Sequence, residues 1–121
     1  MDIKLKAVAV PVSDVDRARH FYRALGFRLD LDQAEGDVRV VQLTPPGSQC
    51  SIIIGTGISS AEPGSAVCVL RVNDLGAAVA DLRARGVAPS PVSHCPAGFA
   101  CLTFTDPDGN TWLLVDDVPV R

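Results

Sequence analysis

Few side chains in this sequence could carry out nucleophilic or acid–base chemistry. One pair stands out, because His94 immediately precedes Cys95 and an imidazole beside a thiol could activate it as a nucleophile. Consecutive residues of a strand point to opposite faces, however, so these two side chains would not meet in a strand. Of this pair, we therefore treat His94 but not Cys95 as a candidate site residue. His20 falls away from the apolar stripe of a predicted helix, which favours a solvent-exposed position.

The cysteines are the second possible source of chemistry. They are Cys50, Cys68, Cys95 and Cys101, and no two form a Cys-x-x-Cys pair. A reactive thiol needs nearby cations or a helix N-terminus, and the sequence indicates no such setting for any of them. A chain of this length can also build its core without disulfide bonds. We therefore expect buried free thiols.

Length and composition limit the class of protein. The chain has 121 residues, of which 47% are hydrophobic and 21% charged, which predicts one folded domain over residues 1–121. The formal charge of -3 provides no basic surface of the kind that nucleic-acid binding requires. The first residues lack the apolar core of a signal peptide, and no apolar run is long enough to span a bilayer. We expect a cytoplasmic protein that binds neither nucleic acid nor a membrane.

An internal repeat determines the expected fold. Residues 12–27 match residues 72–87 without a gap, at a shift of about 60. Each copy begins with an apolar, strand-like run, and a helix signal follows in which Ser13 or Asn73 is expected to supply the N-cap oxygen. Glycines at the ends of the copies, at 26 and 86, are expected to terminate the two helices.

Three strand-like runs follow each predicted helix, so each copy has the pattern βαβββ. After initial strands at 7–12 and 67–72, the runs cover 27–32, 39–43 and 51–55 in the first copy and 87–94, 100–104 and 112–118 in the second. The first of these runs in the second copy is the weakest, because Pro89 and Pro91 cannot donate to a sheet. We predict an α+β fold of two tandem βαβββ modules, about 1–55 and 66–121, joined by a linker at about 56–65.

Four motifs carry a family resemblance. They are VPVSDVDRA at 10–18, FY at 21–22, LGF at 25–27 and FTDPDGN at 104–110. Together they resemble the vicinal oxygen chelate superfamily, which includes glyoxalases, bleomycin-resistance proteins and extradiol dioxygenases. The resemblance covers nearly the whole chain and implies curved mixed sheets around a concave cleft, with helices on the outer face and commonly a homodimer. It leaves the function open, because the superfamily contains metal-dependent enzymes beside metal-free drug-binding proteins.

The resemblance also indicates where metal-using relatives place their ligands. Two histidines lie seven residues before the helix-start aspartates, and a glutamate lies three residues after the asparagine of the DPDGN turn. Those places carry Ala7, Val67 and Leu113 in this chain, and the repeat adds Ile53 as the counterpart of Leu113. None of these side chains can donate an electron pair to a divalent ion. We predict that the superfamily's metal centre is absent and that the protein uses no cofactor.

Alternation along the strands assigns residues to two sheet faces. One sheet face carries the four apolar residues that occupy the metal-ligand positions, and this face is expected to line the cavity. Thr111 and Val115 belong to the same face. With His94 added, the ligand-binding candidates are Ala7, Ala9, Ser51, Ile53, Val67, Val69, Arg71, His94 and Leu113. The opposite face is expected to pack against the helices through Val8, Val10, Cys68, Leu70, Trp112 and Leu114. Arg71 either orients an acceptor group of the ligand or extends along the sheet to solvent.

These observations leave three kinds of function open. The leading hypothesis is a metal-independent small-molecule-binding protein of the glyoxalase/bleomycin-resistance type, for instance one that sequesters an antibiotic. The alternative is a metal-free lyase, isomerase or cyclase that uses the shape of its cavity, Arg71 and His94. A third possibility is an accessory protein that acts only through its dimer surface. The first two predict a small organic ligand bound to a homodimer, with limited ring stacking because most of the six aromatic residues belong to the scaffold.

Overall fold

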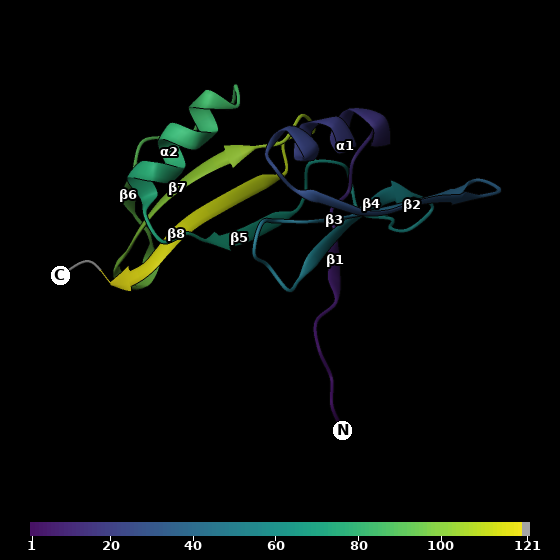
Figure 1. The fold of residues 1–121 in the computed structure, drawn as a ribbon, viewed down its shortest axis with the longest axis horizontal. Coiled ribbons are helices and arrows are strands. Elements are labelled where there is room, and N and C mark those ends of the chain that lie inside the picture. Colours follow the sequence, from purple (N-terminus) through teal and green to yellow (C-terminus); the bar gives the residue numbers. More distant parts are fainter. Residues whose placement is uncertain (120–121) are drawn as a thin grey trace.

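The computed structural model describes residues 1–119, with the side chains of residue 97 and residues 117–119 left out. Within these residues, eight strands, two α-helices and one short 3₁₀ turn follow one another, and Figure 1 shows their arrangement. Their order is β1 (Ala7–Ala9), α1 (Val15–Ala24), β2 (Arg28–Glu35), β3 (Val38–Thr44), β4 (Ser51–Thr56), β5 (Val67–Arg71), α2 (Leu75–Ala84), β6 (Ser93–His94), η1 (Pro96–Gly98), β7 (Phe99–Thr105) and β8 (Thr111–Pro119). Neither α-helix of the described residues is long and apolar enough to cross a membrane.

The two halves of the repeat form two sheets of the same topology. The strand order is β1-β4-β3-β2 in the first sheet and β5-β8-β7-β6 in the second. In each sheet the first strand pairs parallel to the last strand of its module, and the other pairs are antiparallel. Both helices lie on the same side of the molecule, α1 over the first sheet and α2 over the second (Figure 1). The predicted α+β fold of two tandem βαβββ modules with mixed sheets is confirmed.

The bounds of three predicted strands were wrong by three residues or more, and one of them is β2, which extends to Glu35 rather than ending at residue 32. The first strand ends at Ala9 rather than at residue 12. The weak run at 87–94 contributes only Ser93–His94, because the prolines before it cannot donate to a neighbouring strand. Outside that strand, the backbone N–H of Ser90 donates to the carbonyl of Thr103 at 2.8 Å and ties the segment to β7.

The helix starts differ from the prediction by one residue. Asp14 and Asp74 are the N-caps, and their carboxylates accept hydrogen bonds of 3.0 Å from the backbone N–H groups of Arg17 and Ala77. Ser13 instead binds across the module boundary, its backbone N–H and hydroxyl donating to Asp108 at 3.2 and 2.5 Å. Either an Asp or a Ser oxygen can cap a helix, so the local sequence allowed both. Gly26 and Gly86 follow the helices with φ of 92° and 83°, as expected of C-terminal glycines.

The core lies between the helices and the inner faces of the sheets. Val10, Trp112 and Leu114 are at most 3% exposed, as alternation predicts, and Cys68 and Leu70 are half-buried against the same core. Val8 is an exception at 40% exposed. The reason is that α1 packs on β3 and β4, which leaves β1 at the uncovered edge of its sheet.

A buried polar network joins the modules at the centre of the core. The Tyr22 hydroxyl of α1 donates to Asp106 at 2.6 Å and accepts from the indole N–H of Trp112 at 2.9 Å. The side-chain amide of Asn110 donates to Asp106 at 2.8 Å and to the carbonyl of Pro11 at 2.7 Å. Burial and the neighbouring Asp106 carboxylate raise the pKa of Tyr22 far above its usual value. These bonds fix the orientation of one sheet relative to the other.

Candidate functional site

The face of the sheets that the helices leave uncovered carries most of the predicted site residues. Ala9, Val67, Val69, Arg71 and His94 are exposed, Ala7, Ile53 and Leu113 are half-buried, and Ser51 is buried. Val67 and Val69 are 69% and 62% exposed, which is unusual because valine side chains are most often buried. Their exposure follows from the position of β5 at the edge of its sheet.

Four of the predicted residues come together at the boundary between the modules. Ala9 and Ser51 from the first sheet and Val67 and Val69 from the second line one pocket of about 430 Å³, which we call the seam pocket. Carbon and sulfur atoms dominate its walls, which also include both free cysteines, Cys50 and Cys68. The seam pocket can therefore hold an apolar group between the two modules.

A second hollow lies on the open face of the second sheet. It has a volume of about 370 Å³ and is lined by Val69, Cys95, Pro96, Phe99, Leu113 and Val115; we call it the disulfide pocket. Val69 and Leu113 were predicted site residues, and Val69 lines both pockets. Phe99 and Pro96 were missed, because proline and a bulged register interrupt the alternation on which the prediction depended.

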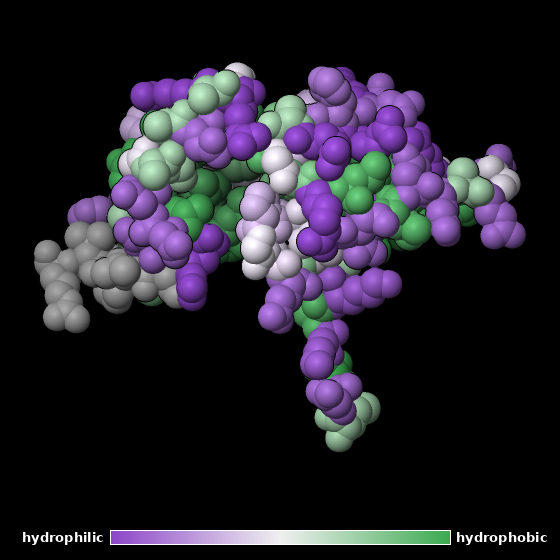
Figure 2. Space-filling model, in the orientation of Figure 1, coloured by the Kyte–Doolittle hydropathy of each residue, from purple (hydrophilic) through white to green (hydrophobic). Residues whose placement is uncertain are grey.

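Arg71 and His94 do not converge. Arg71 lies at the end of β5 and lines a third hollow of about 240 Å³ between α2 and the first module, where Figure 2 shows apolar residues gathered between the two halves. His94 lies on β6 and lines neither the seam pocket, nor the disulfide pocket, nor the hollow beside Arg71. Strands β8 and β7 separate β5 from β6, a distance of roughly 14 Å across three strand spacings. The two side chains are not arranged to act on one ligand atom.

The expectation of four free thiols was wrong. Cys95 and Cys101 form a disulfide with a Cα–Cα distance of 5.9 Å, across the turn that connects β6 to β7. A sulfur in that bond cannot act as a nucleophile with His94. Cys50 and Cys68 are free, and they are half-buried rather than buried. Burial raises the pKa of the Cys68 thiol, so this sulfur is a weak nucleophile at neutral pH.

The sequence interpretation missed a polar cluster on the open face of the first sheet. Thr44 and Ser51 are only 2% and 5% exposed, and their hydroxyl oxygens lie 2.6 Å apart. The Thr44 hydroxyl donates to Asp30, and the Gln42 side-chain amide donates to Ser51 at 3.3 Å. Thr44 has one proton, so the Ser51 hydroxyl must donate to Thr44. A hydrogen-bond chain therefore runs from Gln42 through Ser51 and Thr44 to Asp30.

Arg28 stabilises the negative charge of Asp30 at the end of this hydrogen-bond chain. The Arg28 guanidinium donates to Asp30 at 2.5 Å. This bond and the one from Thr44 lower the pKa of Asp30 below its usual value. Gln42 and Thr44 alternate with Val41 and Leu43, which are fully buried, and that alternation was the signal that could have identified the cluster. Thr44 and Ser51 are buried, so the Gln42 amide and the Asp30 carboxylate are the groups of this cluster that can reach a polar substituent of a ligand.

The four places where metal-using relatives hold ligands do not fit a metal ion. The register pairs Ala7 with Ser51 and Ala9 with Ile53, so Ala7 and Ile53 are diagonal neighbours on one face. Val67 and Leu113 have the same relationship in the second sheet. All four side chains are hydrocarbons without a donor atom. Among the residues that the structure describes, no three His, Cys, Asp or Glu side chains are grouped to hold a metal.

Comparisons with known proteins agree with this architecture. The sequence profile of the Glyoxalase/Bleomycin resistance protein/Dioxygenase superfamily matches residues 4–114. TnmS3, an antibiotic binding protein from Streptomyces sp. CB03234, is 36% identical with a TM-score of 0.82, and the match covers 95% of this chain and 97% of that one. A member of the same superfamily from Sphaerobacter thermophilus DSM 20745 is 30% identical with a TM-score of 0.80, over 94% and 97% of the two chains.

A bleomycin-binding protein complexed with bleomycin shares the fold at 19% identity, with a TM-score of 0.71 over 98% of this chain and 100% of that one. No match was found among curated proteins. The profile match, the tandem βαβββ sheets and the motifs that build them lead to one assignment: the chain belongs to the Glyoxalase/Bleomycin resistance protein/Dioxygenase superfamily.

Proposed function

We propose that this protein binds a small amphipathic organic molecule of the antibiotic type without a metal ion and holds it without chemical change. The observation that carries the proposal is the pair of mostly apolar pockets, the seam pocket and the disulfide pocket, both of which Val69 lines. Similarity over nearly the full chain to TnmS3, an antibiotic binding protein, supports the same function.

The two sheets suit the two ends of an amphipathic ligand. The second sheet offers apolar surface, and burial of about 200 Å² of ligand there contributes roughly 5 kcal/mol before the costs of association. The first sheet offers the accessible Gln42 amide and Asp30 carboxylate, which the buried Ser51 and Thr44 hydroxyls hold in position. Metal independence is supported by the hydrocarbon side chains of Ala7, Ile53, Val67 and Leu113 at the superfamily's ligand places.

The proposal includes a cytoplasmic homodimer. Exposed apolar side chains lie at Leu5, Val67 and Val69, which border the same seam pocket and are 69%, 69% and 62% exposed. Residues 1–6 extend away from the body of the molecule (Figure 1) and add Ile3, which is 73% exposed. A second copy would bury this contiguous surface. Light scattering should give twice the chain mass of 12.7 kDa, and a single-chain mass at micromolar concentration contradicts the dimer.

The binding function can be tested with a thermal-shift screen of glycopeptide, quinone and polyketide drugs. The informative variant is Ala9→Trp, because Ala9 lines the seam pocket and an indole there fills it. Ala80→Trp, on the exposed side of α2, is the matched control. A drug that stabilises the wild type and Ala80→Trp but not Ala9→Trp supports binding in the seam pocket. Equal stabilisation of all three proteins contradicts the proposed site.

Mass spectrometry of each recovered compound separates binding from catalysis. An unchanged compound is expected. A converted compound would replace the proposed function with the metal-free enzyme.

A further inference from the structure

Phe99 differs from every other aromatic residue of the chain. Five of the six rings contact one another in the buried cluster between the modules, and they belong to Phe21, Tyr22, Phe27, Phe104 and Trp112. Phe99 is half-exposed at the start of β7 and lines the disulfide pocket. Trp112 borders the seam pocket, and Phe27 and Phe104 border the hollow beside Arg71, but each of these three is at most 4% exposed. Phe99 is thus the aromatic residue that lines the disulfide pocket from outside the buried cluster.

The pocket that Phe99 lines places its ring on the open face of β7, although the register shifts between Phe99 and Cys101. Ala100, Leu102 and Phe104 pack with the core beneath α2. Cys101, between them, points to the open face and pairs with Val115 across the sheet. Phe99 shares a pocket with Val115, so its side chain also lies on the open face.

The Cys95–Cys101 disulfide determines where this ring can lie. It closes the segment that carries Phe99 into a loop whose two ends are joined covalently. Within the loop, the backbone N–H of Cys95 donates to the carbonyl of Phe99 at 2.7 Å, and that of Gly98 donates to the carbonyl of Cys95 at 3.2 Å. Cys101 is only 3% exposed although it belongs to the open face, because the bonded Cys95 covers it.

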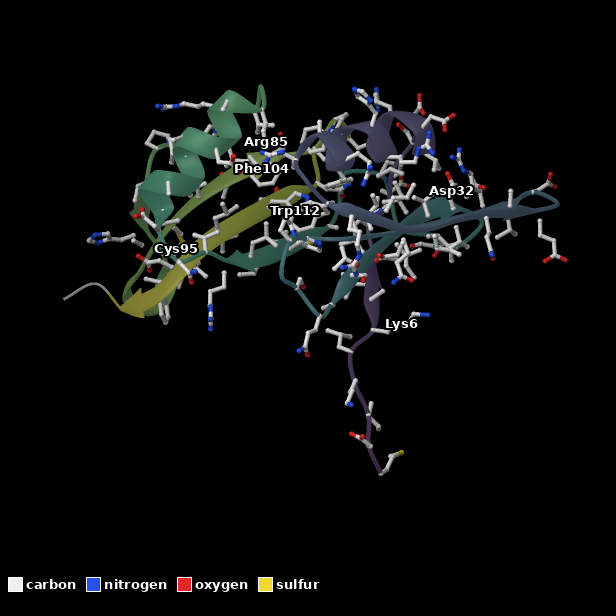
Figure 3. The ribbon with its side chains drawn as sticks, in the orientation of Figure 1. Lys6, Asp32, Arg85, Cys95, Phe104 and Trp112 are labelled. Atoms are coloured by element: carbon white, nitrogen blue, oxygen red, sulfur yellow. A yellow bond between two sulfur atoms is a disulfide. The ribbon has the colours of Figure 1, made fainter. Side chains whose placement is uncertain are left out.

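Other support for the loop is slight. Strand β6 has two residues and pairs within its sheet with β7 alone. Figure 3 shows Cys95 near this outer edge of the second sheet, well apart from Phe104 and Trp112 at the module boundary. Without the bridge, Pro96 and Phe99 would depend on a few backbone hydrogen bonds in an otherwise exposed turn.

We propose that Phe99 is the specificity-determining contact for a neutral, planar aromatic ring of the ligand, and that the Cys95–Cys101 disulfide positions Phe99 for it. The inference rests on the proposed binding function and names the class of molecule that the disulfide pocket takes.

The chemistry of the pocket selects this class. Its six lining residues, including Val69, Leu113 and Val115, present hydrocarbon, one aromatic ring and sulfur, and none is charged. An aromatic ring gains both apolar burial and ring–ring or sulfur–ring contacts in such a pocket. A charged group would lose hydration there without a partner.

Binding of the ring therefore depends on the oxidation state of the protein. A dithiol reductant breaks the S–S bond by supplying two electrons, each cysteine sulfur takes up one proton, and the reductant closes to its own disulfide. The reduced loop no longer holds Phe99 against the pocket, so affinity falls. Oxidation of the two thiols restores it.

The test uses N-phenyl-1-naphthylamine, a neutral aromatic probe that fluoresces in apolar sites, titrated into the full protein with and without dithiothreitol. Oxidised wild type is expected to bind it about tenfold more tightly than the Phe99→Leu variant and than the reduced protein. Phe99→Tyr keeps a ring and should retain the affinity, whereas Phe99→Leu keeps apolar bulk without a ring and should lose it. Cys95→Ser should bind weakly and show no response to dithiothreitol.

Ala80→Ser is the matched control, because Ala80 lies on the exposed side of α2, away from the seam and disulfide pockets, and the affinity of this variant should match the wild type and still fall on reduction. Thiol titration of the unreduced, denatured wild type should find the two free cysteines, Cys50 and Cys68. Four titrating thiols, or equal affinity of the reduced and oxidised proteins, overturns the inference.

The experiments distinguish a wrong assignment of Phe99 from a wrong binding function. If a drug from the panel binds in the seam pocket but neither Phe99→Leu nor dithiothreitol changes its affinity, the protein is a binder and the assignment of Phe99 is wrong. If oxidised wild type binds neither the panel nor the probe, both the binding function and the inference are wrong.

Discussion

The hydroxyl of Tyr22 on α1 donates a 2.6 Å hydrogen bond to the carboxylate of Asp106 after β7, and this buried bond ties the first module to the second. Tyr22 is fully buried, and its oxygen also accepts from Trp112. Tyr22→Phe leaves the Trp112 N–H without its acceptor and removes one donor to Asp106. We expect unfolding free energy to fall by about 1–3 kcal/mol in urea denaturation. An unchanged midpoint contradicts a stabilising role for this network.

The same tyrosine should make the protein sensitive to alkali. The pKa of Tyr22 is raised above its usual value of 10.0 in the folded protein, so its contribution to stability is complete below pH 10. Above pH 10 the unfolded state releases the phenolic proton and the folded state keeps it, so stability falls by about 1.4 kcal/mol per pH unit for this group. Tyr22 is the sole tyrosine in the chain, so tyrosinate absorbance should appear together with unfolding. Titration near pH 10 in the folded protein is the opposite result.

The hydroxyl chain on the first sheet should contribute to stability as well. Thr44→Val keeps the shape of the side chain but leaves the Ser51 hydroxyl without its acceptor in a buried position. We expect a loss of about 1–3 kcal/mol by chemical denaturation. Thr105→Val, at an exposed position at the end of β7, is the control and should change stability little.

Arg39 should control the titration of Asp32. Its guanidinium donates to the two oxygens of Asp32 at 3.0 and 2.9 Å and lowers the pKa of that carboxyl. A lowered carboxyl pKa contributes stability above the usual value, and this is lost as the pH falls through the folded-state pKa. In Arg39→Gln, the pKa of Asp32 measured by NMR should rise toward 3.8, and acid unfolding should begin at a higher pH. Arg83→Gln, on α2, should leave the pKa of Asp32 unchanged.

Chelation tests the metal-independent part of the proposal. Ligand affinity of the purified protein should be the same before and after dialysis against EDTA, because Ala7, Ile53, Val67 and Leu113 supply no donor atoms. Elemental analysis should find less than stoichiometric zinc, iron, manganese or nickel. A loss of affinity on chelation that added metal restores would establish a metal site elsewhere in the chain.

The repeat and the strand alternation were sufficient to predict the architecture. Alternation correctly assigned Val10, Trp112 and Leu114 to the core. Successive side chains of a strand point to opposite faces, and the helices cover one face of each sheet. The alternation prediction was wrong for Val8, because the sequence pattern does not show that α1 covers β3 and β4 but not β1. Burial at an edge strand depends on neighbours that periodicity does not identify.

The residues of the candidate site were harder to predict from the sequence, because they depend on how distant residues pack together. Spacing does not determine cysteine pairing, since Cys95 could equally remain a free thiol. The pairing with Cys101 depends on a turn that brings the two Cα atoms to 5.9 Å. Phe99 becomes a candidate contact only once that turn and the packing of the other five rings are known.

The bond from Ser13 to Asp108 also bears on how the chain folds as it is synthesised. Ser13, the residue before the Asp14 N-cap of α1, donates to a carboxylate that lies 95 residues later in the sequence. Neither Ser13 nor the Tyr22 hydroxyl has its partner until the DPDGN turn has been synthesised. Contacts of such high sequence separation slow folding. We expect the two modules to form in one cooperative, post-translational step rather than in sequence, despite their internal symmetry.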